Sequence, residues 1–391
     1  MNDQITPPVT AGMADAGRLA GHEAAYLREF REPTGYLDFA RFGPVSAGVA
    51  ATLERAVRAV HTQGLPALRA LDAEADAAGR AAARLLHAAA HEVAFVGSTS
   101  HGLFAAAYAL RGPGDVLVCR RDFPAALYPW LRAAERGGLA VRRLDGPPTA
   151  DAVRARLHPG VRAVCVSAVD SVTGFRAPLG AIKEVIGPHR VLVVDAVQAV
   201  GVVPIEVEAA DVLAGGGQKW LRAGWGAALL LVRDRVAGML EPGLGGWSGV
   251  RDPLTGSDHP KQRLPGAAAH TFTNPDGPAV AALGTGISLA LRFGVQQIFE
   301  RATAALELLL EAARSQGCAC DRGGPRPDMR SAIARIRKPG DPETLHRRLL
   351  DAGLTTTLRD GWIRLSPHAS TGGEAALQLA AVLRDDRRTP G

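Results

Sequence analysis

The chain has 391 residues, of which 47% are hydrophobic, and a formal net charge of +6. This length can bury a large core and gives two or three domains as a first estimate. No apolar run approaches the roughly 18 residues of a membrane span, the N-terminus lacks the layout of a signal peptide, and no basic stripe is interleaved with aromatics. We therefore expect a cytoplasmic protein with neither a membrane nor a nucleic-acid partner.

The first half of the chain alternates strand-like and helical runs. Residues 1 to about 20 are polar and rich in Pro, Gly and Ala, which predicts a loose arm, and a helix should follow. Apolar residues at helical spacing predict helices over 47–62 and 66–90. The predicted strands are 93–96, 116–119, 140–144, 163–167, 191–195 and 227–232, with helices expected from about 100, 124 and 149. This alternation predicts an α/β fold with a mostly parallel sheet covered on both faces.

The remainder predicts one long helix and a small α+β unit. The helix runs over 280–293 and should continue toward 315. The unit after it is predicted to hold strands near 331–337 and 361–365 and helices at 342–352 and 372–384. Four cysteines lie at 119, 165, 318 and 320, with no metal-ligand spacing, so we expect no metal site.

Lys219 is the most informative residue. It stands in Gly-Gly-Gly-Gln-Lys-Trp, 24 positions after Asp195 in Val-Val-Asp-Ala-Val-Gln. Pyridoxal phosphate (PLP) needs a lysine amine for a Schiff base and a carboxylate that keeps its ring nitrogen protonated. Asp195 would lie at the carboxyl end of a buried parallel strand, where α/β sheets bind ligands. From three residues further on, Gln198 could donate to the phenolate oxygen of the cofactor ring.

The motifs resemble those of class V (fold type I) PLP enzymes, which include cysteine desulfurases, kynureninases, isopenicillin N epimerase-like proteins and some transaminases. They follow the family's order over nearly the whole chain, at 36–38, 97–102, 122–124, 195–198, 219, 246–249, 272–275 and 363–368. The resemblance implies a large domain with a mostly parallel sheet between helices and a small C-terminal α+β domain. The boundaries we expect are 1–30 for an N-terminal arm and helix, 31–279 for the PLP-binding domain, and 280–391 for the connecting helix and small domain. It also implies a small amino-acid substrate and a homodimer with a shared active site.

The segment 97–102, Gly-Ser-Thr-Ser-His-Gly, lies between a predicted strand and a predicted helix. That context directs backbone N–H groups and a helix dipole at an anion, here the PLP phosphate. The hydroxyls of Ser98, Thr99 and Ser100 would add donors. A plain helix cap is the alternative.

The resemblance places Phe123 on the face of the pyridine ring, where desulfurases carry His. A Phe supplies packing but cannot pass protons, and a plain core position is the alternative. Gln218 stands where desulfurases have His beside the lysine. Their phosphate-binding Ser is Gly216 here, so backbone N–H groups of the 215–217 run are expected to replace its hydroxyl.

Further positions carry over by resemblance. Thr273 matches the residue that reaches the phosphate across the dimer interface, and Trp247 and Asn274 match positions that line the substrate pocket. A turn Asn or a buried Trp without a ligand is the alternative. Arg364 matches the arginine that holds the substrate α-carboxylate, a task that suits its planar fork. Ser171 lies where many relatives have an Asn that contacts substrate.

The reaction type is less constrained than the cofactor. Desulfurases need a Cys on a loop before the carboxylate arginine, but this chain has none after Cys320 and reads Gly-Leu-Thr-Thr-Thr-Leu-Arg-Asp at 353–360. We expect a β-eliminating carbon–sulfur lyase, because Thr355 to Thr357 keep hydroxyls there and the pattern looks like carbon–sulfur lyases of thiol biosynthesis. A class V aminotransferase is the first alternative, and a kynureninase-like hydrolase or an epimerase follows. A PLP-fold protein that binds without turnover is the least favoured.

Overall fold

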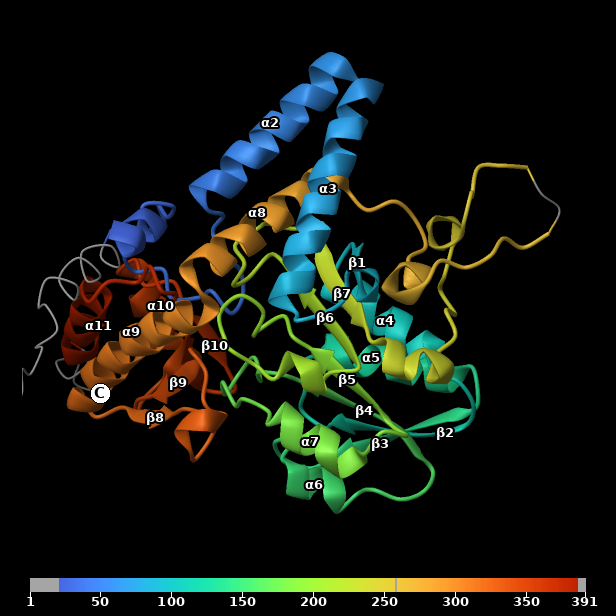
Figure 1. Ribbon diagram of the computed structural model, residues 1–391. Helices are drawn as coiled ribbons and strands as arrows, with labels where there is room; N and C mark the ends of the chain where they lie inside the picture. The colour runs from blue at the N-terminus through green and yellow to red at the C-terminus, as the bar shows by residue number, and fades with distance from the viewer. Residues whose placement is uncertain (1–20, 257–258, 386–391) are drawn as a thin grey trace, which may run out of the picture.

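Two β-sheets organise the computed structural model, which describes residues 21–256 and 259–385 (Figure 1). The larger sheet has the strand order β1-β7-β6-β5-β4-β2-β3. Its strands are β1 (Val93–Val96), β2 (Gly114–Cys119), β3 (Leu139–Leu144), β4 (Val161–Ser167), β5 (Val191–Asp195), β6 (Val212–Gly216) and β7 (Ala228–Val232). Strand β7 runs antiparallel to its neighbours β1 and β6, and the other pairings are parallel. The predicted α/β fold with a mostly parallel sheet is confirmed.

Helices cover both faces of this sheet. The flanking helices are α3 (Leu65–Leu85), α4 (Thr99–Ala109), α5 (Pro124–Glu135), α6 (Ala150–Arg154), α7 (Leu179–Ile186) and α8 (Gly277–Phe293). Successive strand side chains point to opposite faces, so Leu192 and Val194 join one core cluster with residues of α3, α7 and α8, whereas Val193 joins another with residues of α4 and α5. Burial on both faces explains why the strands read as continuous Val and Leu runs.

Helices α2 (Ala47–Gln63) and α3 form a hairpin that projects from the body and packs on α8 (Figure 1). Gly64 between them has a φ of 62°, which glycine adopts without strain. Gly284 of α8 faces Ala78 of α3. A Cβ at residue 284 would lie 2.6 Å from that of Ala78, so this close helix contact requires glycine.

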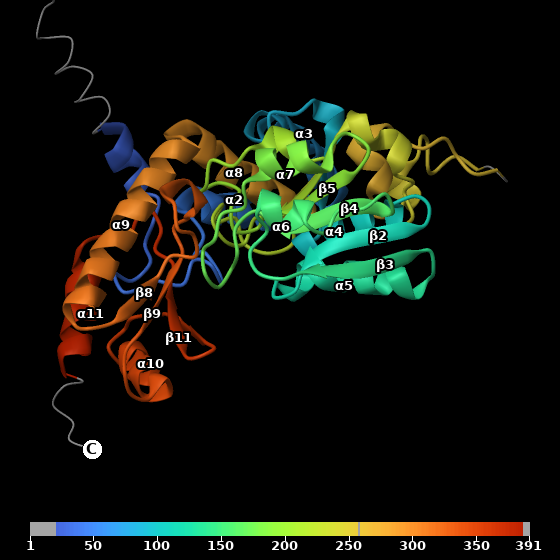
Figure 2. The ribbon, with the colours of Figure 1, turned by 90° about the horizontal axis from the view of Figure 1, so that it is seen from below.

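The smaller sheet has the order β10-β11-β9-β8 and is antiparallel throughout. Its strands are β8 (Ala319–Asp321), β9 (Ala334–Arg337), β10 (Thr357–Arg359) and β11 (Trp362–Leu365). It shares a core cluster with α9 (Val295–Ser315), α10 (Pro342–Asp351) and α11 (Glu374–Asp385). Figure 2 shows this unit to one side of the larger sheet. Short 3-10 helices occupy Ala90–Glu92, Val207–Ala209, Asp234–Met239, Trp247–Gly249, Gly266–His270 and Pro327–Met329.

The single long helix predicted from 280 toward 315 is wrong. Gly294 has a φ of 100° and divides it into α8 and α9, which meet at 83°. In the described part of the chain no helix alone is long and apolar enough to cross a membrane, and only this bent pair taken together passes that test. The predicted domain boundary at 279/280 falls in the first turn of α8, and the predicted arm at 1–20 lies outside the described residues.

Candidate active site

Three predicted site residues meet at the carboxyl edge of the larger sheet. Phe123 directly precedes α5, Asp195 ends β5 and Lys219 follows β6. The Lys219 Nζ lies 5.6 Å from the centroid of the Phe123 ring, and Asp195 interacts electrostatically with the same amine. Phe123 is 41% exposed, so part of its ring is free to contact a ligand. This edge is where open α/β sheets bind their ligands.

Asp195 is a buried carboxyl group with one strong local donor, the backbone N–H of Val197 at 3.0 Å from Oδ1. Burial raises its pKa from 3.8 to about 6, because the charged form loses hydration. The neighbouring carboxylate of Asp122 raises the pKa further, whereas the Val197 N–H and Lys219 act in the opposite direction. A cationic partner placed against this carboxylate would favour its charged form.

Burial also lowers the pKa of Lys219, from 10.5 to about 8. Arg364 adds to this shift, and Asp195 and Asp38 oppose it. A substantial fraction of the amine is therefore neutral in mildly alkaline solution. The neutral amine is the form that attacks an aldehyde or accepts a proton.

The segment 97–102 forms the beginning of α4. The Ser98 hydroxyl accepts the His101 N–H at 3.1 Å, so Ser98 is the N-cap of the helix. Ser100 is exposed. Thr99 is buried, and its Oγ1 has no hydrogen-bond partner among the described residues. A buried hydroxyl without a partner is costly in a folded protein, and a ligand at this helix N-terminus would satisfy it.

Gly216 lies beside that hydroxyl, and its missing side chain leaves the position that Gln218 Oε1 fills. A Cβ at residue 216 would lie 3.0 Å from Thr99 Oγ1 and would collide with the Gln218 side chain. The hydroxyl without a partner and the start of α4 together fit a phosphate group. One expected donor is not available, because the Gly217 N–H donates to the Ala227 carbonyl at 3.2 Å.

Gln198 is held by the protein at both ends of its amide. Its Nε2 donates to the Ala40 carbonyl at 2.8 Å, and its Oε1 accepts the indole N–H of Trp220, also at 2.8 Å. This fixes the orientation of the amide and leaves one Nε2 hydrogen for any ring oxygen.

Arg364 lies in β11 and reaches the loop after β4. Its Nη1 donates to the Ser171 carbonyl at 2.6 Å, and its Nη2 forms an ion pair with Asp38 at 2.7 Å. Thr357, opposite Arg364 in β10, donates through Oγ1 to Asp38 Oδ2 at 2.7 Å. Ser171 thus contacts the arginine through its backbone. Thr356 is buried, and the backbone of Thr355 pairs with Tyr36.

Trp247, Thr273 and Asn274 are exposed. Their segments pair with each other, since the Gly246 N–H donates to the Thr271 carbonyl at 3.0 Å. They also approach the start of α4: the ring centroids of Phe272 and His101 are 4.2 Å apart. Within the described residues no hydrogen bond or ring contact joins Trp247, Thr273 or Asn274 to Lys219 or Asp195.

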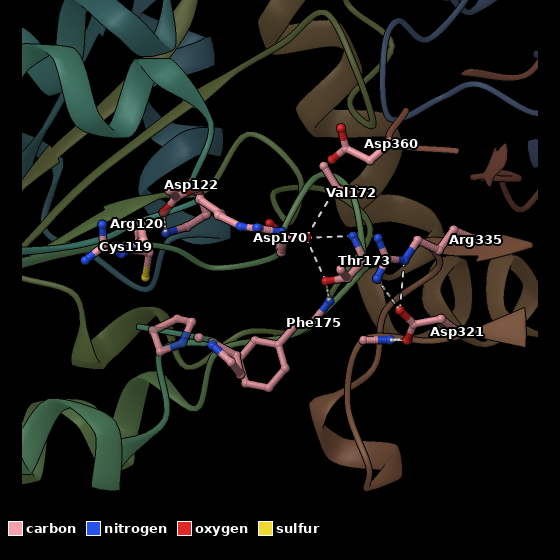
Figure 3. A pocket seen from close by; sticks show the side chains of 16 residues that line it. Cys119, Arg120, Asp122, Asp170, Val172, Thr173, Phe175, Asp321, Arg335 and Asp360 are labelled. Carbon is pink, nitrogen blue, oxygen red and sulfur yellow. Dashed lines mark hydrogen bonds and ion pairs between the residues drawn. The ribbon is translucent and has the colours of Figure 1, made fainter. Parts of the chain in front are cut away.

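A cavity of about 380 Å³ opens beside this site, between the ends of β2 to β4 and the smaller sheet (Figure 3). Asp122 lines it from the larger sheet, and Arg335 and Asp321 point toward each other from the smaller one. It shares Val172 and Arg335 with a small space that Arg364 lines.

Asp122 was not among the predicted site residues. Its carboxylate accepts the hydroxyl of Ser167 at 2.6 Å, the N–H of Ser167 at 3.1 Å and the N–H of Phe123 at 2.7 Å. Burial raises its pKa, and the three donors oppose that rise. Asp122 therefore ties the backbone of Phe123 to the end of β4. It directly precedes Phe123 in the Asp-Phe-Pro motif, but no local pattern indicates its partner 45 residues away.

Known proteins resemble this chain in sequence and in fold. A profile of the family described as "Aminotransferase class-V" matches residues 47–331. The chain belongs to this family. It is therefore a PLP-dependent enzyme, in line with the resemblance found in the sequence.

Similar proteins include the uncharacterized aminotransferase YcbU of Bacillus subtilis, 28% identical over 73% of this chain and 76% of that one. A probable cysteine desulfurase of Aeropyrum pernix is 34% identical over 48% of each chain. Among solved structures, a complex of the cystine C–S lyase C-DES with its product cysteine persulfide has a TM-score of 0.81 at 18% identity, over 90% of this chain and 97% of that one. The apo structure of a cysteine desulfurase from Thermococcus onnurineus has a TM-score of 0.80 at 18% identity, over 90% and 94% of the two chains. At these identities the solved structures support the fold.

Proposed function

We propose that the protein is a lyase that eliminates a β-substituent, in the first place a sulfur-bearing one, from a small α-amino acid in the cytoplasm. The observation that carries the choice is that no cysteine follows Cys320. Persulfide-forming desulfuration would lack its nucleophile. In its place the loop offers hydroxyls, and Thr357 Oγ1 lies 3.4 Å from Nη2 of Arg364.

Four side chains would hold the cofactor. Thr99 and the first N–H groups of α4 would bind the phosphate, and Phe123 would pack against the ring. Asp195 would face the ring nitrogen, and Lys219 would carry the covalent link. When bound, PLP supplies an electrophilic aldehyde and an electron sink for the bonds at Cα.

Lys219 and Arg364 would act on different parts of the substrate. The Lys219 amine, with a pKa of about 8, can accept the Cα proton in its neutral form and return a proton in its charged form. Arg364 would hold the α-carboxylate, which orients the bonds at Cα. The adjoining cavity, which lies between the two sheets, would give a β-substituent space to leave.

An aminotransferase is the second candidate. YcbU, which bears that name, matches 73% of this chain, and the same lysine, aspartate and arginine serve amine transfer. A kynureninase-like hydrolase or an epimerase ranks below it. A binding protein without turnover ranks last, because Lys219, Asp195 and Arg364 are all present.

We place the enzyme in a homodimer with a shared active site. Thr273 is exposed and next to Phe272, which packs on His101 at the start of α4. A partner subunit could bring such a residue to the phosphate. Sedimentation velocity should find a dimer, and an active monomer would remove Thr273, Trp247 and Asn274 from the proposed site.

Product analysis tests the reaction. The holoenzyme is incubated with β-substituted alanines, cysteine conjugates and their sulfoxides, and pyruvate, ammonia and keto acids that retain the substituent are measured. Elimination gives pyruvate and ammonia in equal amounts over many turnovers. Retained-substituent keto acid with an aminated cofactor, and no pyruvate, would replace the lyase by the aminotransferase.

A further inference from the structure

The guanidinium of Arg364 already has a carboxylate partner from its own chain. Nη2 lies 2.7 Å from Asp38 Oδ1, and the two side chains are only 9% and 3% exposed. Nη1 donates to the Ser171 carbonyl. Nε is buried and has no hydrogen-bond partner in residues 21–256 and 259–385.

Asp38 is fixed in place from several sides. Its Oδ2 accepts the hydroxyl of Thr357. The backbone around it pairs with the smaller sheet, because Leu37 donates to the Thr355 carbonyl at 3.0 Å and Phe39 to the Ser366 carbonyl at 3.2 Å. The backbone at Asp38 therefore cannot move away from Arg364 without breaking this pairing.

The same segment continues to the lysine loop. The Ala40 carbonyl accepts from Gln198, and the Gly43 N–H donates to the Gln218 carbonyl at 2.9 Å. A Cβ at residue 43 would collide with the Lys219 carbonyl. Residues 36–43 thus join the strand of Arg364 to the residues beside Lys219.

We propose that the carboxylate of Asp38 pairs with Arg364 as the substrate α-carboxylate would, and that it thereby sets the affinity of Arg364 for the substrate carboxylate. The inference rests on the proposed function of Arg364. In the free enzyme Asp38 balances the buried charge of the guanidinium, which is otherwise costly. A substrate carboxylate then uses Nε and the remaining N–H bonds, and two carboxylates share one cation.

The repulsion between these carboxylates weakens substrate binding. Asn in place of Asp38 keeps the shape and one acceptor for Nη2 but removes the negative charge, and Arg364 keeps its bond to the Ser171 carbonyl. For two charges about 7 Å apart at an effective dielectric constant of about 20, the loss of repulsion corresponds to roughly ten- to fiftyfold tighter binding. A ligand without a carboxylate gains nothing from the change.

The experiment uses L-alanine and ethylamine as probes, which differ by the carboxylate. Their dissociation constants are measured on the holoenzyme from the cofactor absorbance. Asp38→Asn should bind L-alanine at least about tenfold more tightly than the wild type and ethylamine within about twofold. Since Asp38 also raises the pKa of Lys219, the ethylamine arm corrects for any change at the amine.

A second readout needs no cofactor. Cofactor-free Asp38→Asn should melt below the wild type, because the Arg364 charge is uncompensated, and L-alanine should raise its melting temperature more. Asp328→Asn removes the same charge from an exposed ion pair. It should change neither the melting temperature nor the rise that L-alanine causes. If the Asn variant does not fold, Asp38→Ser makes the same charge change with space for a water.

The two proposals fail separately. Unchanged or weaker L-alanine binding by the Asp38 variants overturns the role of Asp38, provided that Arg364→Lys still weakens L-alanine. If the wild type shows no preference for L-alanine over ethylamine and Arg364→Lys has no effect, the carboxylate site itself is elsewhere.

Discussion

The amine of Lys219 lies over the ring of Phe123, 5.6 Å from its centroid, although the two residues follow different strands of the larger sheet. The aromatic surface replaces water on one side of the amine. Burial of the amine as a whole, to which this ring contributes, is the main cause of the low pKa of Lys219. The ring that would pack against the cofactor therefore also contributes to the burial of the amine.

The first prediction concerns pH. Because only the neutral amine attacks an aldehyde, the rate at which cofactor-free protein attaches PLP should rise with pH and level off above about 8. Stopped-flow absorbance from pH 6 to 10 measures this rate. A rate that keeps rising toward pH 10.5, the ordinary value for lysine, would contradict the lowered pKa.

The second prediction concerns Phe123→Ala. Loss of the ring should weaken PLP retention by about 1–3 kcal/mol, because stacking and apolar burial are both lost. Equilibrium dialysis gives the dissociation constant. Tyr128→Ala, which removes an exposed ring further along α5, is the matched control and should retain PLP normally.

The third prediction concerns Asp195→Asn. Turnover should be slower, because loss of the charge beside the ring nitrogen should raise the activation free energy by about 2–4 kcal/mol. The cofactor-free variant should nevertheless be more stable than the wild type at pH 7. The wild type must ionise a buried carboxyl whose folded pKa of about 6 exceeds its ordinary 3.8.

The sign of that stability difference follows from proton uptake. Below pH 3.8 Asp195 is protonated in the folded and unfolded states alike, so it adds no cost. Between 3.8 and 6 the folded state binds more protons, so wild-type stability falls as pH rises, by roughly 1–3 kcal/mol in total. Urea unfolding of the wild type and Asp195→Asn at pH 4 and pH 7 measures this effect. An equal difference in the free energy of unfolding between the two proteins at both pH values would refute the explanation.

The fourth prediction concerns the buried pair of Arg222 and Glu32. The guanidinium is bonded to Glu32 and the Pro44 carbonyl, and it stacks on Phe30. Arg222→Ala leaves Glu32 without its charge partner and should lower the free energy of unfolding by about 3–5 kcal/mol. Arg55→Ala breaks an exposed pair with Glu74 and should cost less than about 1 kcal/mol.

The sequence was most informative where the chemistry is local. Continuous Val and Leu runs marked most of the buried strands, and the run 191–194 placed Asp195 at a strand end. The division of the long helix at Gly294 was missed because the apolar periodicity continues across it. Strand β6 was missed because it ends in glycines, which have a low strand propensity.

Contacts between distant residues could not be predicted. Asp38 and Arg364 are 326 positions apart, and Tyr-Leu-Asp gives no indication of which cation its carboxylate will meet. The two hydrogen bonds of the Gln198 amide, to Ala40 and Trp220, likewise depend on the folded chain. Such pairings follow from the topology of the two sheets rather than from local pattern.

The chain has four lysines, which allows a decisive measurement. Lys183 is paired with Asp211, Lys261 donates to Thr255, and Lys338 donates to the Leu383 carbonyl. Lys219 alone lies at the candidate site. Holoenzyme is reduced with borohydride, digested, and mapped by mass spectrometry. We expect the pyridoxyl group on Lys219 and no covalent cofactor on Lys219→Ala. A stoichiometric label on any other lysine, or none in an active enzyme, would contradict the assignment of this site.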